Sequence, residues 1–214
     1  MADRVGSHNP KDRMGAIVFI THPEVVIDPA VPVPRWPLSP KGRARMEAFA
    51  TALAGRKVAE VWSSDEQKAM DGAAILAQRL GAPHRIEPAL AENGRESTGY
   101  IAPPEFWEVV DQFFARPDES IRGWEKARDA QARIIGAVTQ VDRTAARGVV
   151  LIVSHGGVGA LLTAHLQKVA IGQEDRPQHP GGGCYLVIDR GPLRLRQSWR
   201  AMEEPDAALE AFAP

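Results

Sequence analysis

Short runs of apolar, β-branched residues recur along the chain, and the intervals between them are long enough for helices. The two clearest runs are residues 15–21 (GAIVFIT) and 148–153 (GVVLIV), whose length and composition predict buried strands. Weaker patterns of the same kind predict further strands at 58–62, 84–88, 184–189 and 193–199.

Helix start and stop signals fill these intervals. Ser39 followed by Pro40 is an N-cap with proline at the first helical position, and it predicts a helix that ends near Gly55. Polar residues at 64–66 begin the next helix, which Gly81 closes. Further helices are expected at 104–114, about 119–146, 156–167 and within 203–210. The alternation of strands and helices predicts an α/β fold, a three-layer α/β/α sandwich with a mostly parallel central sheet.

Composition supports one globular unit. The chain has 214 residues, of which 44% are hydrophobic and 25% charged, so disorder, collagen and coiled coil are excluded as its main state. We expect a flexible polar tail at 1–13 and a single domain at 14–214. The sole cysteine, Cys184, excludes a disulfide framework within the chain and is consistent with the cytoplasm, where we expect this protein.

Charge and hydropathy limit the partners. The 26 basic and 27 acidic residues give a net charge of −1, so no basic excess points to nucleic acid. No apolar run approaches the roughly 18 residues of a membrane span, and we expect no membrane partner.

Candidate chemistry lies just after the predicted strands, because ligands of open α/β sheets bind beyond the carboxyl ends of the strands. The first strand ends in Thr21-His22, the strongest strand ends in Ser154-His155, and Glu92 follows the third. A single histidine at a strand end is more often structural. Two histidines at two strand ends, with a carboxylate at a third, favour a functional site.

Four motifs in this order resemble those of the histidine phosphatase superfamily, the phosphoglycerate mutase-like proteins. Thr21-His22-Pro23-Glu24 stands where the family has Arg-His-Gly-Glu, and residues 63–73 resemble its Ser-Ser-Pro-Leu-x-Arg-Ala motif. Leu90-Ala91-Glu92 resembles its Leu-x-Glu motif. Ser154-His155-Gly156-Gly157, followed by a leucine-rich helix, is the most specific match. The resemblance extends from about residue 15 to 199.

This resemblance implies a phosphatase that hydrolyses a small phosphorylated substrate through a phosphohistidine. By similarity, His22 would be the nucleophile, Glu92 the general acid and base, and His155 a donor to the phosphoryl oxygens. The backbone N–H of Gly156, at a helix start, suits an anion as well. We expect no cofactor and no metal. The expected partner is a small phosphorylated molecule or another anion, and a homodimer stays open.

The phosphoryl-binding positions depart from the family pattern. Thr21 and Lys68 replace two arginines, and charge-assisted hydrogen bonds contribute about 1.5–3 kcal/mol each, so phosphoryl binding should weaken unless other cations compensate. Arg95 and Arg35 are the candidates for that compensation. Pro23 replaces a glycine and removes an N–H beside His22.

Two alternatives to a phosphatase stay open. One is a family member that keeps the fold but binds a ligand or a protein partner in a weakened or inactive pocket. A phosphomutase is less favoured, because nothing in the chain indicates retention of a product. The substrate is not identified, since the segment at 93–124 is idiosyncratic. Trp36 and the pair Phe106-Trp107 are core residues by default, with a substrate pocket as the alternative. The glycines at 181–183 favour a tight loop over a ligand site.

Overall fold

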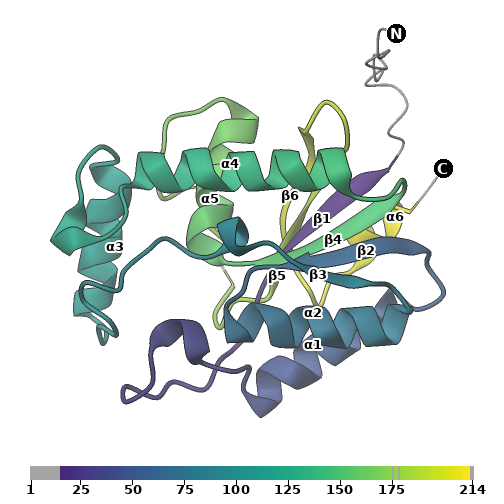
Figure 1. Ribbon diagram of the computed structural model, residues 1–214, viewed down its shortest axis with the longest axis horizontal. Coiled ribbons are helices and arrows are strands. Elements are labelled where there is room, and N and C mark those ends of the chain that lie inside the picture. The colour runs from purple at the N-terminus through teal and green to yellow at the C-terminus, as the bar shows by residue number, and fades with distance from the viewer. Residues whose placement is uncertain (1–14, 175, 178, 213–214) are drawn as a thin grey trace, which may run out of the picture.

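A computed structural model describes residues 15–174, 176–177 and 179–212. The tail expected at residues 1–13 lies outside these described residues. Six strands form one sheet in the order β3-β2-β4-β1-β5-β6 (Figure 1). They are β1 (Ala16–Thr21), β2 (Val58–Ser63), β3 (His84–Ile86), β4 (Val149–Ser154), β5 (Cys184–Asp189) and β6 (Arg194–Ala201).

Four neighbouring strands pair in parallel, and the pairings at one side of the sheet, between β1 and β5 and between β5 and β6, are antiparallel. β4 pairs in parallel with both β1 and β2, and β2 pairs in parallel with β3. β5 runs antiparallel to β1 and β6. The mostly parallel sheet predicted from the sequence is therefore confirmed.

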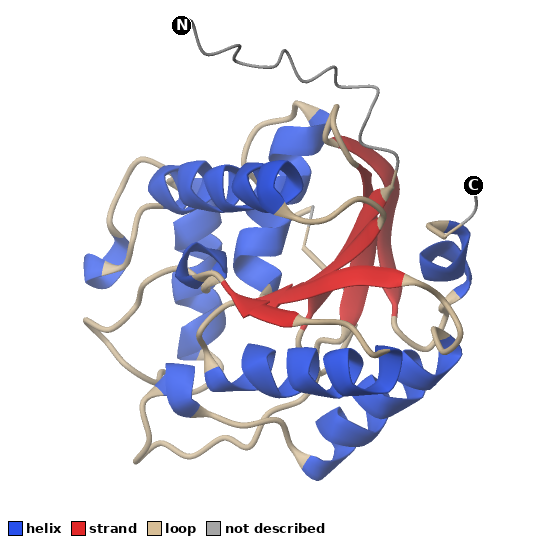
Figure 2. Cartoon of the chain, turned by 45° about the vertical axis from the view of Figure 1, so that its right-hand side comes forward, coloured by secondary structure: helices blue, strands red, loops and turns tan. Residues whose placement is uncertain are grey.

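Helices cover both faces of the sheet, as Figures 1 and 2 show. One face carries α1 (Pro40–Ala52), α2 (Gln67–Leu80) and α6 (Asp206–Glu210). The other carries α3 (Glu105–Ala115), α4 (Ala127–Thr144) and α5 (Gly156–Gln167). Within β1, Val18 and Ile20 pack against the first layer, and Ile17 and Phe19 against the second. Because both faces are covered, β1 is buried along its length and lacks polar alternation.

Local sequence signals account for the helix ends. The Ser39 hydroxyl accepts a hydrogen bond from the Gly42 N–H at 3.0 Å, as an N-cap does, and Gly81 ends α2 in the left-handed conformation. The helix expected from about residue 119 begins only at Ala127. Residues Ile121–Gly123 form a 3₁₀ turn in which Arg122 has a φ of 51°, so the helix cannot extend back through them.

The parallel register aligns the strand ends that matter. Thr21 of β1 is opposite Ser154 of β4, and Ser63 of β2 is opposite Val153. The residues that follow these three strands therefore emerge at one edge of the sheet. Within the described part of the chain, no helix combines the length and apolarity needed to cross a bilayer.

Candidate active site

The two strand-end histidines lie side by side. Because Thr21 and Ser154 are paired across the sheet, His22 and His155 leave it together. Their ring centroids are 5.2 Å apart, with the ring planes at 67°.

One nitrogen of His22 is committed to the backbone. His22 Nδ1 lies 2.9 Å from the Pro23 carbonyl oxygen, which can only accept, so Nδ1 carries the proton and Nε2 has a free lone pair. Burial, together with the charges of His155 and Lys68, lowers the pKa of His22 to about 3. The imidazole is therefore neutral at physiological pH. His22 also lines the main cavity.

His155 is fully buried and does not line the cavity. Its Nε2 is 2.8 Å from Ser64 Oγ and 3.4 Å from Glu66 Oε1, whereas its buried Nδ1 has no hydrogen-bond partner among the described residues. Burial lowers the pKa of His155 more than the nearby carboxylates of Glu66 and Glu92 raise it. His155 is thus a neutral ring with an unpaired nitrogen beside His22.

Glu92 occupies the N-terminus of α5. Its carboxylate accepts hydrogen bonds from the N–H groups of Gly157 at 3.0 Å and Val158 at 2.9 Å. Burial alone would raise the pKa of Glu92, but Arg95, His155 and the Gly157 N–H outweigh it and lower that pKa. A Cβ on Gly157 would lie 2.6 Å from Glu92 Oε1, so this carboxylate position requires glycine at the second position of the Gly156-Gly157 pair.

Hydrogen bonds from two side chains, those of Ser154 and Arg133, hold the segment that carries Glu92. The Ser154 hydroxyl donates to the Leu90 carbonyl at 2.7 Å. The Arg133 guanidinium donates to the carbonyls of Ala91 at 2.8 Å and Glu92 at 3.1 Å. Glu92 is therefore held on a rigid turn at the sheet edge.

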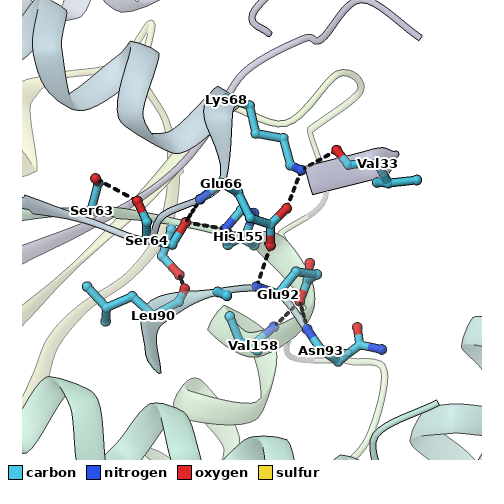
Figure 3. Close-up of polar contacts among 12 residues, drawn as sticks. Val33, Ser63, Ser64, Glu66, Lys68, Leu90, Glu92, Asn93, His155 and Val158 are labelled. Atoms are coloured by element: carbon cyan, nitrogen blue, oxygen red, sulfur yellow. Dashed lines mark hydrogen bonds and ion pairs between the residues drawn. The ribbon is translucent and has the colours of Figure 1, made fainter. Parts of the chain in front are cut away.

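Glu66 is a site residue that sequence reasoning missed. Figure 3 shows its carboxylate between Lys68 and the turn that carries Glu92. One oxygen accepts from the Lys68 ammonium group, and the other accepts from the Glu92 N–H at 2.8 Å and approaches His155. Burial would raise the pKa of Glu66, but His155 and Lys68 outweigh it and hold the pKa well below its usual range. The charge of Lys68 is thus matched inside the protein by a buried carboxylate.

No direct signal in the sequence pointed to Glu66, because acidic residues are common in the first turn of a helix. Here Glu66 is the N-cap of α2, and its side chain makes no capping hydrogen bond. A weak signal was its place in the second motif, where the family has leucine.

Thr21 is turned toward the neighbouring strand. Its hydroxyl accepts from the Cys184 N–H at 2.9 Å and donates to the Cys184 carbonyl at 3.3 Å. Thr21 borders the cavity, but both hydrogen bonds serve the junction between β1 and β5. The threonine therefore replaces an arginine without supplying a free donor.

Arginines from outside the conserved motifs reach the cavity. Arg95 lines it, with its guanidinium carbon 5.4 Å from the Phe106 ring centre. Arg176, which sequence reasoning did not single out, also lines it and lies 5.2 Å from the Trp107 ring centre. Arg35 is exposed and is not among the lining residues.

The cavity has a volume of about 600 Å³. Gly156 and Gly157 border it, as does the glycine loop before β5, where the Gly183 N–H donates to the His22 carbonyl at 3.1 Å. Gly182 has a φ of +65°, and a Cβ there would lie 2.5 Å from the same carbonyl. The loop is therefore tight, as expected, and it also packs against the site. The described residues contain no cluster of histidine, cysteine and carboxylate side chains suited to a metal.

Comparison with known proteins identifies the superfamily of this chain. The profile of the histidine phosphatase superfamily (branch 1) matches residues 33–198, and the chain belongs to this superfamily. The matched range begins after His22. No curated protein sequence matches the chain significantly.

Solved structures show the same fold. A mycobacterial glucosyl-3-phosphoglycerate phosphatase superposes with a TM-score of 0.68 at 24% identity, covering 88% of this chain and 100% of that one. YhfR of Bacillus stearothermophilus gives a TM-score of 0.70 at 21% identity, with 85% and 95% coverage. At these identities the likeness establishes the fold, and the resemblance seen in the motifs is confirmed at the level of the superfamily.

Proposed function

We propose that this protein is a phosphatase that hydrolyses a phosphate monoester through a phosphohistidine on His22. The observation that carries the proposal is the neutral His22 ring, whose Nδ1 is fixed by the Pro23 carbonyl and whose Nε2 is left as a nucleophile beside the cavity. Membership of the histidine phosphatase superfamily supports the same reaction.

In the first step, His22 Nε2 bonds to phosphorus and the bond to the ester oxygen breaks. Glu92 gives its proton to the leaving oxygen, which departs as an alcohol. Glu92 must take up that proton beforehand, and the negative charge of the bound phosphoryl group favours the uptake. In the second step, water attacks phosphorus, Glu92 accepts the water's proton, and His22 is released with inorganic phosphate.

The phosphoryl oxygens need donors in place of the two motif arginines. Arg95 and Arg176 line the cavity and supply positive charge. The Asn93 side chain also lines it, and its buried Nδ2 has no hydrogen-bond partner among the described residues. We assign these three side chains to phosphoryl binding. His155 would add its unpaired Nδ1 as a donor only in the tautomer that carries the proton there, with the Ser64 hydroxyl donating to Nε2.

Trapping the phosphoenzyme tests this proposal. The protein is mixed with a ³²P-labelled monoester or acetyl phosphate, quenched in alkali and analysed for acid-labile label. We expect label on His22, none in His22→Ala, and normal labelling in His165→Ala, which removes an exposed histidine of α5. Equal labelling of wild type and His22→Ala would rule out the mechanism.

A second function, ligand binding without turnover, is favoured by one observation. Glu66 matches the charge of Lys68 and lies near His155, so two expected phosphoryl ligands already have a carboxylate between them. If this alternative holds, calorimetry will detect binding of inorganic phosphate while no monoester produces acid-labile label or free phosphate.

A further inference from the structure

The cavity beside His22 has a continuous aromatic wall. The wall, defined as Phe106, Trp107, Phe113, Phe114 and Trp124, comes from α3 and the segment that follows it. Its rings contact each other edge to face or tilted, with centroids 4.9 Å apart for Phe106–Trp107 and 6.2 Å apart for Phe113–Trp124. A second pair, Trp36 and Tyr100, also borders the cavity.

Two indole N–H groups that border the cavity are already engaged. Trp124 Nε1 donates to Thr98 Oγ1 at 2.8 Å. Trp36 Nε1 donates to the carbonyls of Asp28 and Val31 at 2.9 and 3.0 Å. These two indoles therefore offer ring surface, and no N–H, to a bound molecule.

Carboxylates that could hold sugar hydroxyls are engaged too. Among the described residues, the carboxylates that line the cavity are Glu92 and Glu24. Glu92 accepts N–H groups at the start of α5, and Glu24 pairs with Lys41 at 2.9 Å. Sugar hydroxyls would compete with these contacts for both carboxylates, whereas an apolar ring needs no polar partner when it loses its hydration.

The size of the cavity favours a bulky alcohol over a small one. A volume of about 600 Å³ is in the range that holds a drug-sized ligand. A phosphoryl group with a two- or three-carbon alcohol would fill only part of this volume.

We propose that the substrates of this site are phosphate monoesters of bulky, uncharged alcohols that carry apolar rings, and that the aromatic wall binds those rings. This inference rests on the proposed function for the reaction at His22. It assigns α3 to substrate recognition, with Trp107, which is 47% exposed, at the edge of the wall.

A matched pair of esters tests the inference. 2-(Naphthalen-2-yl)ethyl phosphate and ethyl phosphate both release a primary alcohol, so the basicity of the leaving oxygen is nearly the same and the difference reports the ring. We expect kcat/KM to be at least about 100-fold higher for the naphthyl ester, since one methylene in an apolar pocket already changes it by about tenfold or more. Glucose 6-phosphate, tested alongside, should resemble ethyl phosphate.

Two variants test whether the preference for the naphthyl ester comes from the aromatic wall. Trp107→Ala should reduce the preference for the naphthyl ester by about tenfold. Ile86→Ala is the matched control, because Ile86 is 51% exposed on β3 and does not line the cavity; it should leave the preference unchanged. Both positions are half exposed, so folding should be preserved in each variant.

The outcomes separate the inference from the reaction. Equal kcat/KM for the two esters, or a higher value for glucose 6-phosphate, would overturn the substrate class and leave the phosphatase intact. If no ester is hydrolysed, the corresponding phosphonates are titrated by calorimetry. Selective binding of the naphthyl phosphonate would then keep the ligand class and reject the phosphatase, whereas equal or absent binding would overturn the class.

Discussion

Replacing Glu66 with glutamine should strengthen the binding of inorganic phosphate. The carboxylate pairs with Lys68 and lies 3.4 Å from His155 Nε2, so its charge opposes any anion that His22 and His155 would share. Glutamine keeps an oxygen that can still accept from the Glu92 N–H, which Glu66 now accepts at 2.8 Å. The change therefore removes charge with little change in shape.

The expected size follows from the distances. The His155 ring centre lies 5.2 Å from that of His22, and His155 Nε2 lies 3.4 Å from Glu66, so an anion beside His22 would sit about 7–9 Å from the Glu66 carboxylate. Two unit charges at that distance repel by about 2 kcal/mol at an effective dielectric constant of about 20. Solvent in the cavity reduces this repulsion, and we expect phosphate to bind Glu66→Gln about 10- to 30-fold more tightly.

Isothermal titration calorimetry with phosphate at low ionic strength measures the change without relying on turnover. Glu60→Gln is the control, because Glu60 is also buried but lies on β2 outside the cavity lining, where it accepts from Trp62 Nε1 at 2.8 Å. Unchanged or weaker phosphate binding by a Glu66→Gln protein of normal melting temperature would refute the reasoning. It would mean that Glu66 supports the anion site through His155 or Lys68.

Three further predictions concern the reaction, pH and stability. Glu92→Gln should lower kcat/KM for alkyl phosphates by about 10²–10⁴-fold but lower it much less for 4-nitrophenyl phosphate, whose leaving group needs no proton; equal losses would argue against proton transfer by Glu92. The pKa of His22 is about 3 in the folded protein and about 6.5 unfolded, so the unfolded chain binds the extra proton and the free energy of unfolding should fall as pH drops from 6.5 toward 3. The slope should be at most about 1.4 kcal/mol per pH unit for this group, and urea titrations that show the same slope in His22→Gln would contradict it. Arg190→Met should cost about 3–5 kcal/mol of unfolding free energy, because Arg190 pairs with Asp142 in a buried site at 3.0 Å; a urea midpoint within error of wild type would show that the pair is dispensable.

The buried strands could be predicted closely, and the long helix could not. The runs at 15–21 and 148–153 became β1 and β4 almost residue for residue, because strands covered on both faces are continuously apolar. Ile121 and Trp124 are buried at helical spacing, which suggested a helix from about residue 119. They belong instead to a 3₁₀ turn and its end, since apolar spacing reports burial and not the backbone angle of Arg122.

At the site, residues at strand ends could be located from sequence, whereas their partners could not. The sheet edge brings His22, His155 and Glu92 together, and their chemical roles stay predictions. The hydroxyl of Thr21 bonds to Cys184, 163 residues away along the chain, and no local pattern encodes that contact. Arg176 lies in a loop without periodicity, so only the folded chain shows that it reaches the cavity.

The positions of Arg95 and Arg176 in the chain link phosphate binding to recognition of the alcohol. In the family pattern the phosphoryl arginines belong to the strand-end motifs, but here Arg95 and Arg176 come from variable segments and rest on rings of the aromatic wall. A guanidinium over an aromatic face is partly held in place by the ring, so displacing the ring also displaces the charge. Trp107→Ala should therefore weaken the binding of inorganic phosphate as well as that of the apolar ester, because it removes a ring on which Arg176 rests. A calorimetric affinity for phosphate that Trp107→Ala leaves unchanged would separate the two functions and show that the contact between Arg176 and Trp107 is not needed for phosphate binding.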